Sequence, residues 1–213
     1  MPLYKTITVD ESTNVLIWKI EETYESLCEG IELTQHCQDR VDHMKSEIHR
    51  RGFMSVRHLL AVMGYVDHDL YYDEYGKPHL KDGRKISITH SFEFAGIIIS
   101  DKEVGIDIEK QREKIQSIAH KFVKTSENEY VEENSMDRVR ALTIIWGAKE
   151  SLYKMYATPG LSFQEHIYIS SFMLDYPFVF GAINYKNVIS HYDLAFIEFD
   201  GYTCVYALPA SQV

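Results

Sequence analysis

Apolar and polar residues alternate near the start of the chain and then change to a longer period. Residues 3–9 and 14–20 alternate, contain β-branched residues and flank a DESTN turn, which predicts a β-hairpin. Between about residues 39 and 63 the apolar residues recur at helical spacing, and Gly64 follows them, which predicts a helical stretch. Gly52 interrupts this stretch, so either two helices or one weakened helix fits the pattern.

The middle of the chain returns to strand-like patterns. Residues 72–85 are rich in turn formers and charges, so we expect a loop there. Strand-like segments follow at residues 85–89, 92–100 and 103–109. The SDKE sequence between the last two predicts a hairpin turn.

The second half begins again with helical spacing. Ile115, Ile118 and Phe122 share one face of a short predicted helix. The sequence from about residue 137 to residue 157 predicts a longer helix, which a Thr-Pro-Gly sequence ends. Strands are expected at about residues 167–173, 177–183, 193–199 and 202–208.

Each half therefore offers several strands and one long helix. This order predicts an α+β fold made of two similar subdomains, each with a small antiparallel sheet and a long helix. We place the N-terminal subdomain at residues 1–105 and the C-terminal subdomain at residues 106–213. No low-complexity linker separates the two, so we expect them to pack tightly.

Composition is that of a soluble globular protein, with 45% hydrophobic and 25% charged residues in a chain of 213. No segment has the length and apolarity of a membrane span, and the first residues lack the apolar core of a signal peptide. The three cysteines are too few for a disulfide framework, and Cys28, His36 and Cys37 lack zinc-finger spacing. We therefore expect a cytoplasmic protein.

Net charge adds a constraint on partners. The formal charge of −10 opposes sequence-independent binding to nucleic acid, which needs an excess of Lys and Arg. Residues 110–124 differ from the rest, because they contain five basic residues and one acid. This local basic patch favours a small anion or an acidic partner.

One candidate for chemistry is the GIDIE sequence at residues 105–109. On a strand, Asp107 and Glu109 share one face, while Ile106 and Ile108 point the other way and can enter the core. Two such carboxylates repel each other unless a cation lies between them, and oxygen ligands suit Mg²⁺ or Mn²⁺. A solvated strand face with two acids is the alternative.

A second candidate is WGAKESLYK at residues 146–154. On a helix, Trp146, Glu150 and Lys154 lie near one face. The acid could bind a metal while Lys149 and Lys154 hold phosphate oxygens. The alternative is an ordinary Glu150–Lys154 surface pair, which stabilises a helix by about 0.3–0.5 kcal/mol.

Weaker candidates lie in the first half of the chain. His90, within SITHS, has hydroxyl residues on both sides and can donate hydrogen bonds to phosphate oxygens. Most lone histidines are simply hydrogen-bonded residues of a turn, which is the alternative. The other candidates are basic residues of a GKP turn and of the first predicted helical stretch: Lys77, Lys45, Arg50, Arg51 and Arg57.

Taken in order, YGKPHL, SITHS, GIDIE and WGAKESLYK resemble the motifs of the 4'-phosphopantetheinyl transferases. The length and the two-part layout are similar to the surfactin-type branch of that family, whose members are single-chain pseudodimers. The resemblance extends over about residues 45–165, and the pairing of GIDIE with W-x-x-K-E-x-x-x-K is its most specific part. It implies two α+β subdomains packed as a pseudodimer.

The resemblance also implies a reaction. The phosphopantetheine arm of coenzyme A would move to a serine of an acyl- or peptidyl-carrier protein, with release of 3',5'-ADP. Asp107, Glu109 and Glu150 would hold Mg²⁺, or Mn²⁺, against the pyrophosphate. Glu150 is also the expected base for the serine proton, directly or through a metal-bound water, with Lys154 as its catalytic neighbour.

The resemblance further implies which residues contact coenzyme A. Arg57, and less securely Lys45, match positions that bind its 3'-phosphate. Thr89 stands where the family more often has Ser, and both residues carry a hydroxyl. The full set of expected contacts is Lys45, Arg57, Lys77, Thr89, His90, Lys149 and Lys154.

Carrier proteins are acidic around the modified serine, which suggests a use for the basic stretch at residues 110–124. Ile115 and Ile118 could seat an apolar helix face of the partner. Arg112, Lys114 and Lys121 could attract its acids. Alternatively, the two isoleucines face the protein's own core.

Two other functions fit the same residues. One is a binding module for coenzyme A or a carrier protein that has lost catalysis, and the other is a different metal-dependent phosphotransferase or hydrolase that needs no carrier protein. The presence of all three acids and both motif lysines favours an enzyme. We expect a monomer, since a pseudodimer completes its active site within one chain, and neither nucleic acid nor a membrane as partner.

Overall fold

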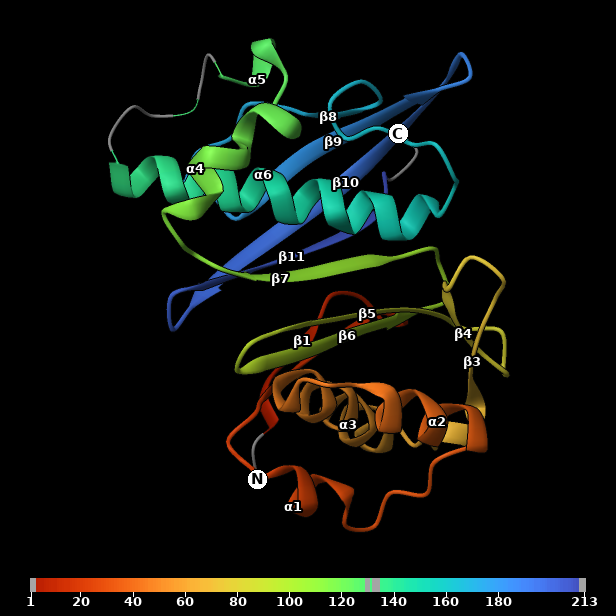
Figure 1. Cartoon of the computed structure of the whole chain (residues 1–213). Helices are drawn as coiled ribbons and strands as arrows, with labels where there is room; N and C mark the ends of the chain where they lie inside the picture. Colours follow the sequence, from red (N-terminus) through yellow and green to blue (C-terminus); the bar gives the residue numbers. More distant parts are fainter. Residues whose placement is uncertain (1–2, 129–130, 132–134, 211–213) are drawn as a thin grey trace. The chain divides into compact units, whose positions relative to one another are not determined.

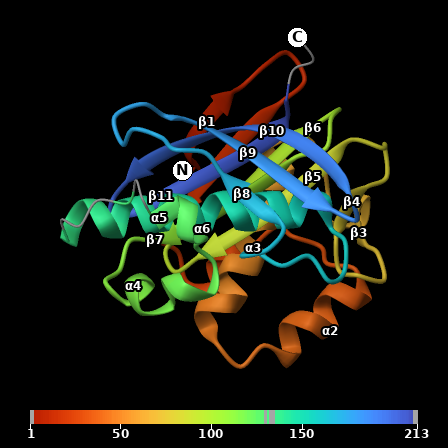
Figure 2. The same ribbon diagram turned by 90° about the horizontal axis from the view of Figure 1, so that it is seen from above.

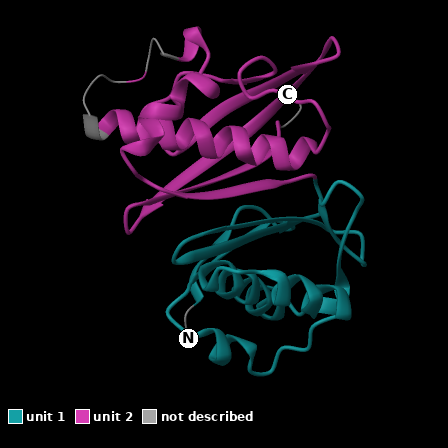
Figure 3. Cartoon of the chain, in the orientation of Figure 1, with its two compact units in different colours: residues 1–102 teal, residues 103–213 magenta. Residues whose placement is uncertain are grey.

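The chain consists of two compact units, Met1–Lys102 and Glu103–Val213 (Figure 3). The computed structural model describes residues 3–128, 131 and 135–210. The predicted division after residue 105 lies close to this boundary, and Gly105 already pairs with Ala207 inside unit 2. Each unit has its own cluster of buried apolar side chains.

Unit 1 is built on a six-stranded antiparallel sheet in the order β1-β2-β6-β5-β4-β3 (Figure 1). The predicted N-terminal hairpin is confirmed, because β1 and β2 pair directly. Strand β6 lies between β2 and β5, and all of its residues are buried. The strands are β1 (Leu3–Thr8), β2 (Asn14–Lys19), β3 (Leu70–Tyr72), β4 (Pro78–Leu80), β5 (Lys85–Ser91) and β6 (Phe94–Ser100).

The helical stretch of unit 1 consists of two helices, α2 (Gln35–His43) and α3 (Glu47–Val62), after a short α1 (Tyr24–Cys28). The chain breaks before α3 and not at Gly52, which lies inside that helix. A Cβ on Gly52 would lie 3.1 Å from Cγ of His90 on β5. The missing side chain therefore makes room for the imidazole, while α3 packs on β6, β2 and β5. A 3₁₀ turn, η1 (Asp67–Asp69), leads into β3.

Two expectations about connections were wrong. The predicted loop at residues 72–85 contains the short strand β4. The predicted hairpin between β6 and β7 does not form, because β6 is already paired on both sides in unit 1 and β7 pairs with β11 in unit 2. Instead, β6 forms a tight hairpin with β5, in which Phe92 adopts a φ of 50°.

Unit 2 has a five-stranded antiparallel sheet in the order β7-β11-β10-β9-β8, and the long helix α6 lies along one of its faces (Figures 1 and 2). The strands are β7 (Gly105–Lys110), β8 (Ile167–Ile169), β9 (Phe178–Tyr185), β10 (Val188–Phe199) and β11 (Tyr202–Pro209). The helices are α4 (Lys114–Ile118), η2 (Ala119–Lys121), α5 (Thr125–Asn128) and α6 (Ser135–Tyr156).

The predicted fold class is confirmed in both units, since each combines an antiparallel sheet with a long helix. The predicted short and long helices of the second half correspond to α4 and α6. Within the described part of the chain, no helix is both long and apolar enough to span a membrane.

Helix α6 approaches the sheet of unit 2 through two glycines. A Cβ on Gly105 of β7 would lie 1.9 Å from the carbonyl oxygen of Ser151, and one on Gly147 would lie 2.9 Å from Cγ2 of Val205. The hydroxyl of Ser151 donates a hydrogen bond to the carbonyl oxygen of Val205 at 2.9 Å. Backbone of the helix and backbone of the edge strand are therefore in direct contact.

We predict that Gly105→Ala lowers the free energy of unfolding by at least about 4 kcal/mol, because the new methyl group would overlap helix backbone that cannot yield locally. Urea denaturation measures the loss. Gly181→Ala is the matched control, since its Cβ would meet the ends of the side chains of Leu152, Leu194 and Ile169 and no backbone atom. It should cost about 1–3 kcal/mol. Equal losses in the two variants would contradict the backbone contact.

Candidate active site

Strand β7 presents its carboxylates to helix α6. Gly105, Asp107 and Glu109 alternate along the strand, and Gly105 lies directly beneath the helix. A Cβ on Gly147 of α6 would lie 3.9 Å from Oδ2 of Asp107. The predicted alternation is thus confirmed, and the alternative of a solvated strand face is wrong, since Asp107 is 5% exposed.

The isoleucines of the motif point away from the helix. Ile106 and Ile108 are fully or almost fully buried. Neither belongs to the apolar cluster between α6 and the sheet of unit 2. Both isoleucines are therefore buried, as expected. They do not lie under α6, however, because that helix covers the strand face that carries the carboxylates.

Lys154 joins the helix to the strand. Its ammonium group donates to Oδ1 of Asp107 at 2.7 Å and to the carbonyl oxygen of Ile106 at 2.9 Å. The side chain of Asp107 is 7% exposed and that of Lys154 is 29% exposed. The lysine of the helix thus partly neutralises a buried carboxylate of the strand. The alternative from the sequence, a surface ion pair with Glu150 on the same helix, does not describe this contact.

The other two carboxylates have raised pKa values. Burial, followed by the charge of Asp107, raises the pKa of Glu150 to about 7, although Lys154 opposes the shift. Burial and the charge of Asp107 also raise the pKa of Glu109, while its hydrogen bond from Trp146 and the charges of Lys154 and Arg112 lower it. Asp107, Glu109 and Glu150 therefore feel one another electrostatically in a poorly hydrated place.

Trp146 forms the border between these carboxylates and a pocket. Its indole Nε1 donates to Oε1 of Glu109 at 3.3 Å. The rings of Phe122 and Phe163 contact the indole at centroid distances of 5.0 and 5.5 Å. The pocket has a volume of about 280 Å³ and is lined by Glu109, Lys110, Arg112, Lys114, Ile115, Ile118 and Trp146.

Most of the residues predicted to dock a partner lie at this pocket. Ile115 and Ile118 line it and also pack against the core of unit 2, as the alternative interpretation expected. Their role in docking stays a prediction. Arg112 and Lys114 are exposed on the rim of the pocket. Lys121 is exposed but does not line the pocket.

The carboxylates suit a divalent metal ion by their chemistry. They are hard oxygen ligands. After burial, the charge of Asp107 is the second cause that raises the pKa values of Glu109 and Glu150, and a cation would relieve this repulsion. In residues 3–128, 131 and 135–210, however, no group of three or more His, Cys, Asp or Glu side chains is arranged so that it could hold a metal ion. The positive charge beside Asp107 in this structure is that of Lys154.

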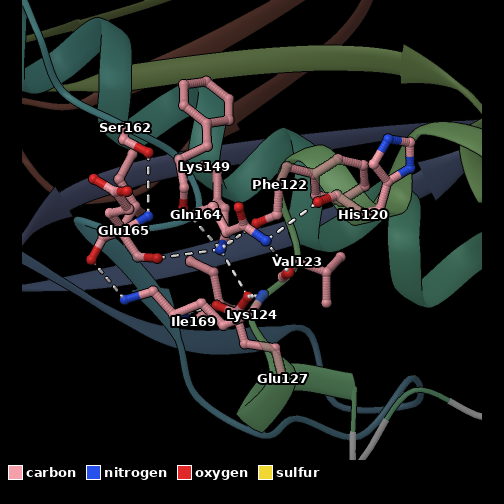
Figure 4. A network of polar contacts seen from close by, with 12 residues as sticks. His120, Phe122, Val123, Lys124, Glu127, Lys149, Ser162, Gln164, Glu165 and Ile169 are labelled. Carbon is pink, nitrogen blue, oxygen red and sulfur yellow. Dashed lines mark hydrogen bonds and ion pairs between the residues drawn. The ribbon is translucent and has the colours of Figure 1, made fainter.

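Lys149 lies elsewhere than predicted. Its ammonium group is completely buried and forms an ion pair with Oε2 of Glu127 at 2.7 Å (Figure 4). It also donates to the carbonyl oxygens of Phe122, Phe163 and Ile167. Burial lowers the pKa of Lys149 to about 8, against the charge of Glu127. Since four oxygens surround its three N–H groups, this lysine has no donor left for a phosphate of coenzyme A.

Arg57 requires a similar correction. Its guanidinium is buried in unit 1, where Nε donates to Oδ1 of Asp67 at 2.8 Å and Nη2 contacts Sγ of Cys37 at 3.2 Å. The guanidinium carbon also lies 3.5 Å from the centre of the Phe53 ring. This arginine is therefore part of the core of unit 1, and the predicted contact to a 3'-phosphate is not supported.

The remaining predicted contacts to coenzyme A lie in unit 1. Lys45 is exposed between α2 and α3, and Lys77 lies in the turn before β4. On β5, Thr89 is buried and His90 is exposed. The ring of His90 lies 5.9 Å from that of His49 on α3, a neighbour that the sequence analysis missed because the two residues are far apart in the chain.

We predict that Glu150→Gln stabilises the protein in the presence of EDTA at high pH. Because the folded-state pKa of Glu150 is raised from 4.5 to about 7, the folded protein holds this proton where the unfolded chain has lost it. The contribution of Glu150 to stability therefore falls as pH rises through this window. The variant should gain about 1–3 kcal/mol near pH 8 and little near pH 5, as measured by urea denaturation.

Asp175→Asn is the control, because Asp175 is an exposed acid in a turn of unit 2. It should change stability equally little near pH 5 and near pH 8. A gain in Glu150→Gln that did not depend on pH would contradict the raised pKa.

Comparison with known proteins relates this segment to a family. Residues 103–178 match the family model of the 4'-phosphopantetheinyl transferase superfamily. The chain is 30% identical over 156 residues to the 4'-phosphopantetheinyl transferase gsp of Aneurinibacillus migulanus, which covers 70% of this chain and 62% of that protein. It is 32% identical over 83 residues to enterobactin synthase component D of Salmonella typhi, covering 38% of this chain and 36% of the relative.

The chain thus spans less than two thirds of the length of each of these relatives. The matched segment contains both the carboxylate strand β7 and the helix α6 that faces it. The chain is therefore similar to the 4'-phosphopantetheinyl transferase superfamily in the segment that contains the candidate site.

Proposed function

We propose that this protein transfers the 4'-phosphopantetheine arm of coenzyme A to a serine of an acyl- or peptidyl-carrier protein, in a Mg²⁺-dependent reaction that releases 3',5'-ADP. The observation that carries the proposal is the electrostatic coupling of three buried or half-buried carboxylates, Asp107 and Glu109 on strand β7 and Glu150 on the helix α6 that packs against it. The name of the relative from Aneurinibacillus migulanus supports the same reaction.

The transfer breaks one bond and forms another at the β-phosphorus of coenzyme A. The serine oxygen attacks phosphorus as its proton leaves, and the bond from phosphorus to the oxygen of 3',5'-ADP breaks. We assign Glu150 as the group that accepts the proton. A base is most effective when its pKa lies near the working pH. Without a cation, burial and the charge of Asp107 raise the pKa of Glu150 to about 7, and a bound cation would lower it again.

The site must also bind a highly charged pyrophosphate. Bound by Asp107, Glu109 and Glu150, Mg²⁺ or Mn²⁺ would neutralise negative charge that develops on the phosphate oxygens. Lys154 already lies at Asp107 with its side chain 29% exposed, and we assign its ammonium group to a phosphate oxygen as well. The chain itself thus orients the reacting groups and supplies a fixed positive charge.

Contacts from unit 1 to coenzyme A remain proposals. The candidates are Lys45, Lys77, Thr89 and His90. Lys45 and His90 have the exposure that a phosphate ligand needs. Arg57 and Lys149 are left out of the set, because both are buried and ion-paired with acids of their own units.

We place this activity in the cytoplasm and in a monomer. Cys28, Cys37 and Cys204 are all free thiols, which is typical of a reducing compartment. The three carboxylates that we assign to the reaction all come from unit 2 of a single chain.

The direct test is intact mass spectrometry of an apo-carrier protein after incubation with this protein, coenzyme A and Mg²⁺. We expect a gain of about 340 Da, the mass of one phosphopantetheine group, and its loss when EDTA is added. Asp107→Asn should lower the rate at least about a hundredfold, since it removes a charge that the site uses to bind the metal.

Lys5→Gln is the control variant, because Lys5 lies on the exposed strand β1 of unit 1, and it should transfer at the normal rate. No gain of mass with any of several carrier types, although coenzyme A binds, would indicate a binding module. Turnover of coenzyme A without any carrier protein would indicate a different phosphotransferase or hydrolase.

The exposed basic residues near the pocket generate a second prediction. Replacing both Lys114 and Lys121 by Glu should weaken binding of an acidic carrier protein on the order of tenfold at low salt, because it removes attraction across the interface. Binding of coenzyme A should be unchanged. Titration calorimetry measures both affinities separately.

The matched control replaces Lys5 and Lys186 by Glu, which changes the net charge equally at exposed positions that do not line the pocket. It should leave the affinity for the carrier protein almost unchanged. An equal loss in both double variants would show that only the overall charge matters, and would contradict docking at this pocket.

A further inference from the structure

The buried ammonium group of Lys149 contacts the same two residues that enclose Trp146. Phe122 and Phe163 each place a ring against the indole. Their backbone carbonyl oxygens accept hydrogen bonds from Nζ of Lys149 at 2.7 and 3.1 Å. One lysine therefore holds the backbone of both residues, Phe122 and Phe163, whose rings pack against the indole.

Glu127 forms an ion pair with this lysine and connects it to two other segments of unit 2, residues 124–127 and strand β8. Its Oε2 accepts from Lys149 and from the backbone N–H of Lys124, both at 2.7 Å. Its Oε1 accepts from the backbone N–H of Ile169 on β8 at 2.8 Å. The carboxylate is completely buried, so both of its oxygens are satisfied inside the protein.

The segments that carry Phe122 and Phe163 are also tied directly to each other (Figure 4). Nε2 of Gln164 donates to the carbonyl oxygen of His120 at 3.2 Å. Nζ of Lys124 donates to the carbonyl oxygen of Glu165 at 3.0 Å. Residues 120–124 and 163–167 are thus hydrogen-bonded to each other and to Lys149 of helix α6. We call these two segments, with the ion pair of Lys149 and Glu127 between them, the clamp.

The clamp ends at the candidate active site. Trp146, which it encloses, donates to Oε1 of Glu109 and lines the pocket together with Ile115 and Ile118. A shift of the clamp would therefore move the indole, and with it the carboxylate that the indole orients.

We propose that Lys149 and Glu127 are positioning residues: through Phe122 and Phe163 they set the orientation of Trp146, and through Trp146 that of Glu109. The catalytic consequence rests on the proposed function, whereas the effect on Trp146 does not. Hydrogen-bonded partners of a ligand typically change metal affinity or activity about 10–100-fold when they are removed. A buried lysine adjacent to Glu150 can thus matter to the reaction without touching a substrate.

The test uses Trp146 fluorescence in the full-length protein. Trp18→Phe provides the background, since Trp18 and Trp146 are the two tryptophans of the chain. In this background we compare Lys149→Met with the double variant Lys149→Met/Glu127→Gln. The single variant leaves Glu127 buried without its counter-ion and should lose much of its stability.

The double variant separates positioning from stability. It removes both charges, so stability against urea should largely return, but the carbonyl groups of Phe122 and Phe163 still lack their donor. We expect Trp146 to emit at longer wavelength and to be quenched more readily by acrylamide. The apparent affinity for Mg²⁺ and the rate of phosphopantetheine transfer should fall about 10–100-fold.

Leu194→Ala is the control for general destabilisation, because Leu194 lies on β10 in the same core cluster. It should lower stability and leave the emission and quenching of Trp146 unchanged. Normal emission and quenching of Trp146 in the double variant would overturn the proposal, as would a normal rate of transfer with an altered indole. If the wild-type protein transferred nothing, the fluorescence arm would still decide the positioning role.

Discussion

Direct contact between the backbones of helix α6 and strand β7 is the constraint on which the candidate active site depends. Gly105 places no side chain between the strand and Ser151, and Ser151 is hydrogen-bonded to the sheet. At this spacing a glutamate of the helix and two acids of the strand feel one another's charge. The chemistry of the site is therefore a result of packing, because only glycine at the crossing point allows the two elements to meet so closely.

The same closeness has an electrostatic cost. Asp107, Glu109 and Glu150 are brought together where water is scarce, and Lys154 supplies one positive charge to them. A protein with such a site gives up some stability for a function that needs concentrated charge. The apolar cluster beneath α6, together with the buried pair formed by Lys149, offsets this repulsion and keeps the helix in place.

Local patterns were predictable from the sequence, whereas partners distant in the chain were not. The β1–β2 hairpin, the alternation along β7 and the extent of α6 follow from periodicity, and the structure confirms them. For Lys149 and Arg57 the family resemblance implied contacts to phosphate oxygens, which their buried ion pairs do not support. Each lies three residues before a buried leucine of its helix, so helical periodicity did place it on an apolar face. Its buried acid, Glu127 or Asp67, comes from another segment, and no local pattern identifies such a pair. The β6–β7 hairpin was wrong for the same reason, since strand order depends on which edges are already occupied.

The position of β7 at the edge of its sheet has a consequence for how the molecule is made. Its partner in the sheet is β11, which follows all the other described strands of unit 2 in the sequence. A ribosome therefore releases the carboxylate strand long before the segment that holds it, and the pairing must close a loop of most of unit 2. Unit 1, whose strands all precede residue 103, can complete its sheet earlier. Unit 1 can thus be folded while the acids of β7 still lack their partner strand, and the candidate site is complete only after β11 has been synthesised.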